Sequence, residues 1–191
     1  MNNKLIGICV GHSRTMNGRV EGGASAWDGH ENEWHFNRDL AKRIKSFLSA
    51  HNVNSVMYDK YEGVGYLQAQ KMLAASLKSR GVTHAIELHF NSAGPAAHGH
   101  EVLFWHASAK GRTLALSIEK SLSAHFNTPA RGAKGLTSSD RGAEFVRGTH
   151  CPAVIVEPFF GSSKKDWQAV AERPDELAKA IAEGIVAAIH A

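Results

Sequence analysis

Short apolar runs alternate along this chain with longer segments in which apolar residues recur every three or four positions. Short runs of this kind are typical of buried strands, and the helical period is typical of amphipathic helices. Strands that alternate with helices predict an α/β fold built on a largely parallel sheet. The expected strands are Leu5–Val10, Val53–Tyr58, Thr83–Phe90, Glu101–Trp105 and Ala153–Glu157.

The segments between these strands are predicted to be helices or loops. The last helix is expected to begin at Pro174, because proline is favoured in a first helical turn. Glycine-rich and polar stretches predict loops, and the longest of them is expected to be a functional region with short elements. The other predicted helices are Glu31–His51, Tyr66–Arg80, Lys110–Phe126 and Lys164–Val170. The predicted loops are Gly11–Gly29, Asn91–Gly99 and Asn127–Thr149.

The composition is that of a folded protein. The chain has 191 residues, of which 43% are hydrophobic and 21% charged, so it can bury a core as one domain, and we exclude disorder. The net charge of +4 favours an anionic partner, but no run of five basic residues supports nucleic-acid binding. The two cysteines, Cys9 and Cys151, are too few for a disulfide framework.

The N-terminal segment bears on localisation. Its apolar run, Leu5–Val10, is too short for the core of a signal peptide or for a transmembrane segment. We therefore expect synthesis in the cytoplasm, with release by another factor if the target lies outside.

Three polar residues lie where predicted strands end. His12 follows the first strand, His89 lies near the end of the third, and Glu157 ends the last. Ligands of open α/β sheets bind beyond the carboxyl ends of the strands. We therefore expect these three side chains to meet at one edge of the sheet.

A fourth candidate, Glu33, lies on the apolar face of the first predicted helix. On a helical wheel it lies about 20° from Leu40, whereas Glu31 lies about 180° away. A carboxylate on a buried face is costly unless it is paired or binds a metal. Two histidines, one carboxylate and a water form a common catalytic zinc site, which His12, Glu33 and His89 would supply. Glu157 would then be the general base.

Each candidate also has an ordinary interpretation. His12 alone is compatible with a loop histidine, Glu33 with a partly solvated first-turn acid, and Glu157 with an arginine partner. Glu87 shares a strand face with His89 and either orients it or pairs with a lysine. Weaker candidates, expected to face solvent or substrate, are His98, His100, Arg131, Lys134, Arg141 and Arg147.

At these residues the sequence resembles the zinc N-acetylmuramoyl-L-alanine amidases of the amidase-3 type, above all the catalytic domains of phage endolysins. The resemblance implies a sheet of about six strands flanked by helices on both faces, and zinc bound by His12, Glu33 and His89. It also implies a catalytic Glu157. Asn91 and Arg131 are the expected substrate contacts. The matching segments are Cys9–Ser13, Asn32–Asn37, Ile86–Asn91, Gly99–Leu103, Arg131–Lys134 and Ala153–Phe160.

The implied function is hydrolysis of the amide between N-acetylmuramic acid and L-alanine in peptidoglycan. Residues 1–191 are expected to form a single catalytic domain, monomeric and without a separate wall-binding domain, that acts on the cell wall after release. Two positions depart from the family pattern, since Ser13 and Phe159 stand where many members have glycine. The alternatives are a zinc peptidase that cuts within the stem peptide, an inactive wall-binding module, and a host autolysin in place of a phage enzyme.

Overall fold

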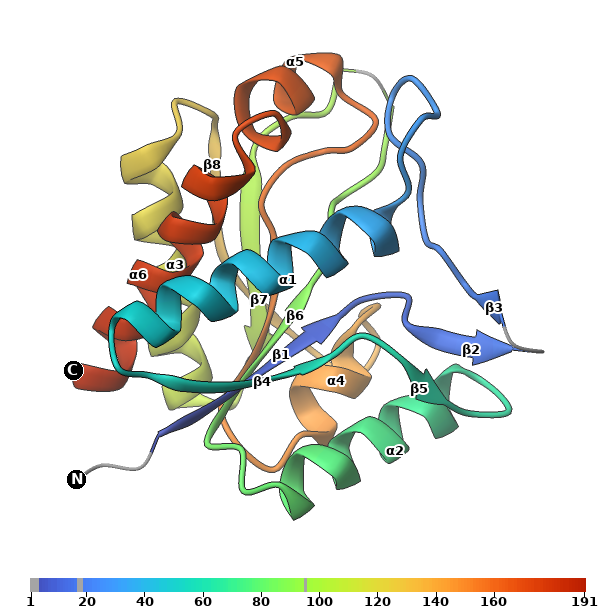
Figure 1. Ribbon diagram of the computed structural model, residues 1–191, viewed down its shortest axis with the longest axis vertical. Coiled ribbons are helices and arrows are strands. Elements are labelled where there is room, and N and C mark those ends of the chain that lie inside the picture. The colour runs from blue at the N-terminus through green and yellow to red at the C-terminus, as the bar shows by residue number, and fades with distance from the viewer. Residues whose placement is uncertain (1–3, 17–18, 95) are drawn as a thin grey trace.

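A six-stranded sheet forms the centre of the computed structural model, which describes residues 4–16, 19–94 and 96–191 (Figure 1). Four neighbouring strands run parallel, β7 pairs antiparallel with β9, and β8 runs parallel to β7. The mostly parallel α/β sheet predicted from the sequence is thus confirmed. In spatial order the strands are β4 (Asn54–Tyr58), β1 (Leu5–Val10), β6 (His84–Leu88), β9 (Ala153–Glu157), β7 (His100–Trp105) and β8 (Ala130–Leu136).

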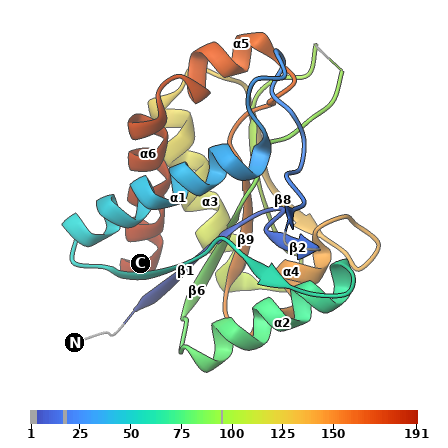
Figure 2. The same ribbon diagram turned by 45° about the vertical axis from the view of Figure 1, so that its right-hand side comes forward.

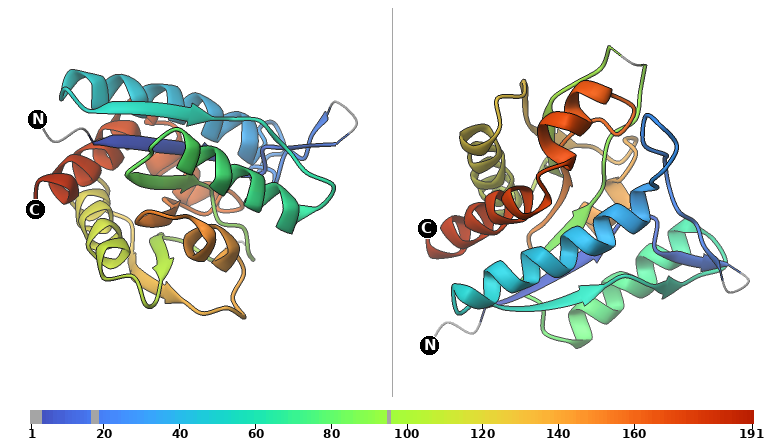
Figure 3. Two further views of the ribbon diagram at one scale, coloured as in Figure 1. Left: turned by 90° about the horizontal axis from the view of Figure 1, so that it is seen from below. Right: turned by 45° about the horizontal axis from the view of Figure 1, so that its top comes forward.

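Helices cover both faces of the sheet, as predicted. One face is covered by α1 (Glu33–Ala50), α3 (Ala109–His125) and α6 (Pro174–His190), and the other by α2 (Tyr66–Ser79) and α4 (Ala143–Gly148). Figures 2 and 3 show α1 and α2 on opposite sides of β1 and β4. Over the described ranges, none of the helices is long and apolar enough to cross a bilayer.

Alternation along the strands divides the core between these two faces. In β1, Ile6 and Ile8 pack towards α1 and α6, whereas Cys9 packs towards α2. In β9, Val154 and Val156 face the first helical layer and Ile155 faces α2 and α4. Glu157 follows the same alternation and therefore lies on the α2 and α4 face of the sheet.

Capping residues set the helix ends. The side chain of Asn32 accepts a hydrogen bond from the backbone N–H of His35, so α1 begins at Glu33 and the predicted start at Glu31 is wrong. Pro174 begins α6, as predicted. The predicted helix Lys164–Val170 is instead a short helix, α5 (Lys164–Asp166), that continues into the π-helical segment η1 (Trp167–Ala171).

Two predicted loops contain strands. Within Gly11–Gly29, β2 (Arg14–Met16) and β3 (Arg19–Val20) form a small sheet with β5 (Tyr61–Glu62). The Asn127–Thr149 region contains β8 and α4, so the short elements expected within it are present, and β8 joins the main sheet. As an edge strand paired with β7 alone, β8 is only partly buried, so its sequence lacks the apolar run that marks a central strand.

Candidate active site

A cleft of about 750 Å³ opens at the edge of the sheet where β1, β6 and β9 end. His12, Glu33, His89 and Glu157 all line it. The convergence expected from the strand ends is therefore present in the structure. Glu157 ends β9, whereas His12 and His89 lie just after β1 and β6, and Glu33 reaches the cleft from the first turn of α1.

A tight turn after β1 positions His12. The residue adopts a left-handed backbone conformation, with a φ angle of 56°. The buried Ser13 hydroxyl donates to the Val10 carbonyl at 2.6 Å, which closes the turn. Ser13, one of the two departures from the family pattern, thus stabilises the turn that presents His12 to the cleft.

Glu33 is 3% exposed and is held by backbone donors. The N–H of Ala24 donates to its Oε2 at 3.0 Å, and the N–H of Phe90 donates to its Oε1 at 3.2 Å. The same carboxylate contacts both histidines, with Oε1 at 2.8 Å from Nδ1 of His89 and Oε2 at 3.3 Å from Nε2 of His12. These fixed contacts explain how a carboxylate is tolerated on the buried side of α1.

The donor atoms of His12, Glu33 and His89 lie within 4.8 Å of one another. Two imidazole nitrogens and one carboxylate are the protein donors of a common type of catalytic zinc site. Glycines permit this close packing, because a Cβ at Gly11 would lie 2.3 Å from the His89 ring and one at Gly23 would lie 2.7 Å from Glu33 Oε2. The three residues therefore fit a metal ion in both donor type and spacing.

The electrostatics of Glu33 and His89 favour positive charge between them, whereas burial lowers the pKa of His12. Burial lowers the pKa of His89, but hydrogen bonds to Glu33 and Glu87 outweigh burial and hold that pKa well above its ordinary value. Burial likewise raises the pKa of Glu33, but the hydrogen bond and charge of His89 outweigh it and lower that pKa. A divalent cation among the three side chains would meet the same negative potential.

A second carboxylate supports His89 from the other side of its ring. Glu87, which is 2% exposed, places Oε2 3.3 Å from His89 Nε2. The buried Gln70 of α2 donates from Nε2 to Glu87 Oε1 at 3.2 Å. With Nε2 facing Glu87, Nδ1 of His89 faces Glu33 and is the atom available as a ligand.

Glu157 lies beside this trio without a strong partner of its own. Its Oε2 is buried and has no hydrogen-bond partner among the described residues. The pKa of Glu157 is raised to about 8, mainly by burial. The positive charge of His89 lowers this pKa, and the negative charges of Glu33, Glu101 and Glu87 raise it. The pKa of this carboxyl group thus lies near neutrality, the range suited to proton transfer at physiological pH.

The sequence profile of the N-acetylmuramoyl-L-alanine amidases of the amidase-3 family matches residues 6–187. The chain belongs to this family. It is a peptidoglycan amidase, and its substrate bond joins N-acetylmuramic acid to L-alanine. No curated protein matches the chain.

Solved structures of amidases share the fold of this amidase. The catalytic domain of the CD27L endolysin targeting Clostridia difficile is 26% identical, with a TM-score of 0.80 over 96% of this chain and 97% of that one. An amidase from Clostridium difficile 630 is 20% identical, with a TM-score of 0.82 over 100% and 99% of the two chains. AmiC2 of Nostoc punctiforme is 22% identical, with a TM-score of 0.80 over the same shares. At 20% and 22% identity, the last two comparisons show only that the fold is shared.

Sequence reasoning missed Glu101, although it lines the cleft of the amidase. It is the register partner of Glu157, because β7 runs antiparallel to β9 and so begins where β9 ends. Its carboxylate accepts hydrogen bonds from Asn91 Nδ2 at 2.9 Å, Arg131 Nε at 2.8 Å and Lys134 Nζ at 2.5 Å. The position of Glu101 in the cleft follows from the antiparallel direction of β7, which the sequence pattern does not reveal.

The two predicted substrate contacts, Asn91 and Arg131, therefore share one partner, Glu101. Asn91 also lines the cleft, whereas Arg131 is outside that lining and lies over the ring of Phe160 at 5.0 Å. The expectation that His100 faces solvent or substrate is wrong. It is buried, and its ring nitrogens lie 3.0 Å from the hydroxyls of Thr128 and Ser123, so it has a structural role.

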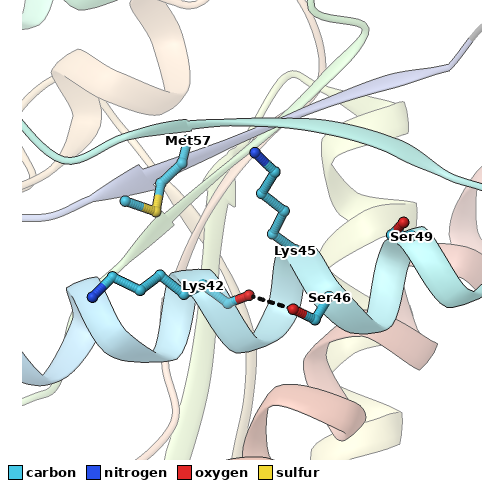
Figure 4. A pocket seen from close by; sticks show the side chains of 5 residues that line it. All are labelled: Lys42, Lys45, Ser46, Ser49 and Met57. Carbon is cyan, nitrogen blue, oxygen red and sulfur yellow. Dashed lines mark hydrogen bonds between the residues drawn. The ribbon is translucent and has the colours of Figure 1, made fainter.

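A second hollow, which shares no lining residue with the cleft, lies between α1 and β4 (Figure 4). It is shallow, and among its described lining residues the polar groups are lysines and serines, with no carboxylate or histidine. These residues supply neither a metal site nor a proton-transfer pair. The lining residues are Lys42, Lys45, Ser46, Ser49 and Met57.

Proposed function

We propose that this amidase is zinc-dependent, with His12, Glu33 and His89 as the zinc ligands and Glu157 as the catalytic acid and base. The observation that carries this proposal is the meeting of three metal-type donors within 4.8 Å beside a buried, unpartnered carboxylate. Zinc bound there supplies a Lewis acid for the carbonyl of the scissile amide.

The protein residues then have separate roles. Glu157 takes a proton from the attacking water and delivers it to the leaving nitrogen, which is a poor leaving group unless protonated. Its position at the end of β9, followed by Pro158, limits the directions in which its carboxylate can point. Glu87 holds Nε2 of His89, which leaves Nδ1 on the side of Glu33 and the proposed zinc.

The test is to measure bound metal and wall hydrolysis on one purified sample, before and after chelation and after zinc is returned. We expect about one zinc per chain, loss of hydrolysis on chelation and recovery with zinc. His89→Ala should lower the zinc content. Full activity in the metal-free protein would refute zinc dependence, and unchanged zinc in His89→Ala would refute the ligand assignment.

Product analysis separates this function from its alternatives. An amidase releases peptides whose free N-terminus is alanine and leaves the lactyl groups on the sugar. A zinc peptidase acting within the stem would leave the first alanine joined to the lactyl group, and a wall-binding module would release nothing.

We further propose that the protein is an endolysin made in the cytoplasm of a phage-infected cell and acting on the wall after release. Its 26% identity to the endolysin catalytic domain supports this role. A pI of about 9.1 would assist attraction to anionic wall polymers. Expression inside cells should cause lysis only when the inner membrane is permeabilised, and lysis without permeabilisation would contradict the release step.

A further inference from the structure

Arg141 lines the cleft as a cation that is not engaged elsewhere. Over the ranges the structure describes, its side chain is exposed and makes no ion pair or hydrogen bond. The other lining arginine, Arg14, pairs with Glu21 at 3.3 Å. The two cations that neutralise Glu101 are outside the lining of the cleft. Arg141 is therefore the cationic group of the cleft that is available to a ligand.

A closed turn between β8 and α4 carries Arg141. The N–H of Thr137 donates to Asp140 Oδ2 at 2.7 Å, and the N–H of Asp140 donates to the Thr137 carbonyl at 3.1 Å. Gly142 has a φ angle of 86°, and a Cβ added there would lie 2.6 Å from Ile155 Cδ1. The backbone beside Arg141 is thus packed directly against the side chain of Ile155.

This packing places the turn that carries Arg141 beside Ile155, close along β9 to the proposed catalytic carboxylate. Ile155 precedes Glu157 by two residues on the same face of β9, a spacing of about 7 Å along the strand. Ile155 and Leu103 line the cleft and provide apolar surface there. Because Glu157 protonates the leaving nitrogen, the peptide attached to that nitrogen begins at Glu157 and can extend over Ile155 to Arg141.

The acidic lining of the cleft makes such a cation useful to an anionic peptide. The lining holds the side chains of Glu21, Glu33, Glu87, Glu101 and Glu157, and a substrate carboxylate would gain no ion pair from any of them. The second residue of the stem peptide is a glutamate linked through its side chain, so its α-carboxyl group is either a free carboxylate or a neutral carboxamide. That group follows the leaving nitrogen by one residue, so a peptide that extends over Ile155 brings it towards the turn that carries Arg141.

We propose that Arg141 binds the α-carboxylate of the second stem-peptide residue, and that the enzyme thereby prefers the acidic stem to the amidated one. This inference rests on the proposed function, since it uses the role of Glu157. The planar guanidinium group suits the recognition, because it can donate two parallel hydrogen bonds to a carboxylate.

The experiment compares two soluble muropeptides that differ only in a carboxylate or a carboxamide at this position. The ratio of their kcat/KM values is measured for the zinc-loaded wild type, Arg141→Gln, Arg141→Glu and Arg112→Gln. Arg112 is a matched control, an exposed arginine on α3 outside the cleft lining. We expect wild type and Arg112→Gln to prefer the carboxylate form by about tenfold. The ratio should fall to near one in Arg141→Gln and below one in Arg141→Glu.

The outcomes distinguish this inference from the proposed function. If the wild type cleaves both substrates equally, or if Arg141→Gln keeps the wild-type ratio, Arg141 is not the carboxylate site although the amidase function stands. If the zinc-loaded wild type cleaves neither substrate, or releases no peptide with N-terminal alanine, the proposed function fails and this inference fails with it.

Discussion

Glu87 Oε2 lies 3.3 Å from Nε2 of His89, while Nδ1 of the same ring lies 2.8 Å from Glu33. The imidazole is therefore held between two buried carboxylates, one beside the proposed metal position and one behind it. A carboxylate behind a ligand histidine fixes its tautomer and ring orientation and makes the ligand more basic.

Glu87→Gln should weaken zinc binding by about tenfold, because the neutral amide keeps the shape of the side chain but removes its charge. The measurement is competition with a chelator of known zinc affinity. Glu172→Gln, at an exposed position outside the cleft, is the control and should match the wild type. Equal zinc affinity in Glu87→Gln and the wild type would show that Glu87 does not support the site.

Gly23→Ala should disturb the metal site through crowding. A Cβ at Gly23 would lie 2.7 Å from both Glu33 Oε2 and His12 Cδ2. Gly22→Ala is a matched control, since Gly22 has a φ angle of 89° but its Cβ would meet nothing within 4 Å. Both variants should lose about 1 kcal/mol of stability from backbone strain, and only Gly23→Ala should also lose zinc affinity. Equal zinc affinity in the two variants would contradict this account.

Stability should depend on pH through Glu101. Burial raises the pKa of Glu101, but the hydrogen bonds and charges of Lys134 and Arg131 outweigh burial and hold it below the ordinary value of 4.5. The folded state therefore binds this proton less readily than the unfolded state does. The Glu101 carboxylate therefore stabilises the fold fully at pH values above its pKa in the unfolded chain. This stabilisation is lost as the pH falls through its lower pKa in the folded protein.

Glu101→Gln should therefore lower the free energy of unfolding by about 1–2 kcal/mol at pH 7, allowing for the partial exposure of both cations. The difference from the wild type should shrink as the pH falls below 4.5. Urea unfolding of the wild type and of Glu101→Gln, at pH 7 and at acid pH, measures this difference in free energy. A difference that stays constant across this range would mean that the charge of Glu101 is not responsible.

Glu157→Gln tests the proton-transfer role with little change in shape. Turnover should fall by about 10²–10⁴-fold, since the amide can neither accept nor deliver the proton. Zinc content should stay close to wild type, which separates this residue from the ligands. The unfolding midpoint should stay the same or rise, because the amide removes a buried group whose pKa burial raises. Near-normal turnover would remove Glu157 as the acid and base.

Much of this architecture follows from local sequence patterns. The strands Leu5–Val10 and Ala153–Glu157 have the predicted bounds, because central strands need apolar side chains on both faces. The ends of the predicted parallel strands placed His12 and His89 at one edge of the sheet. The helical period placed Glu33 on the buried side of α1. These features depend on residues close in sequence, so the sequence alone was enough to predict them.

The tertiary structure alone decided the direction of β7 and the existence of β8. Both depend on pairing between distant segments, and β8 lies at an edge where little apolar surface is buried. That pairing set Glu101 beside Glu157 and turned Arg131 towards Glu101. It also brought the turn carrying Arg141 against Ile155. Local periodicity records which face of an element is buried, but the partner strand and its direction are fixed only when distant segments pack together.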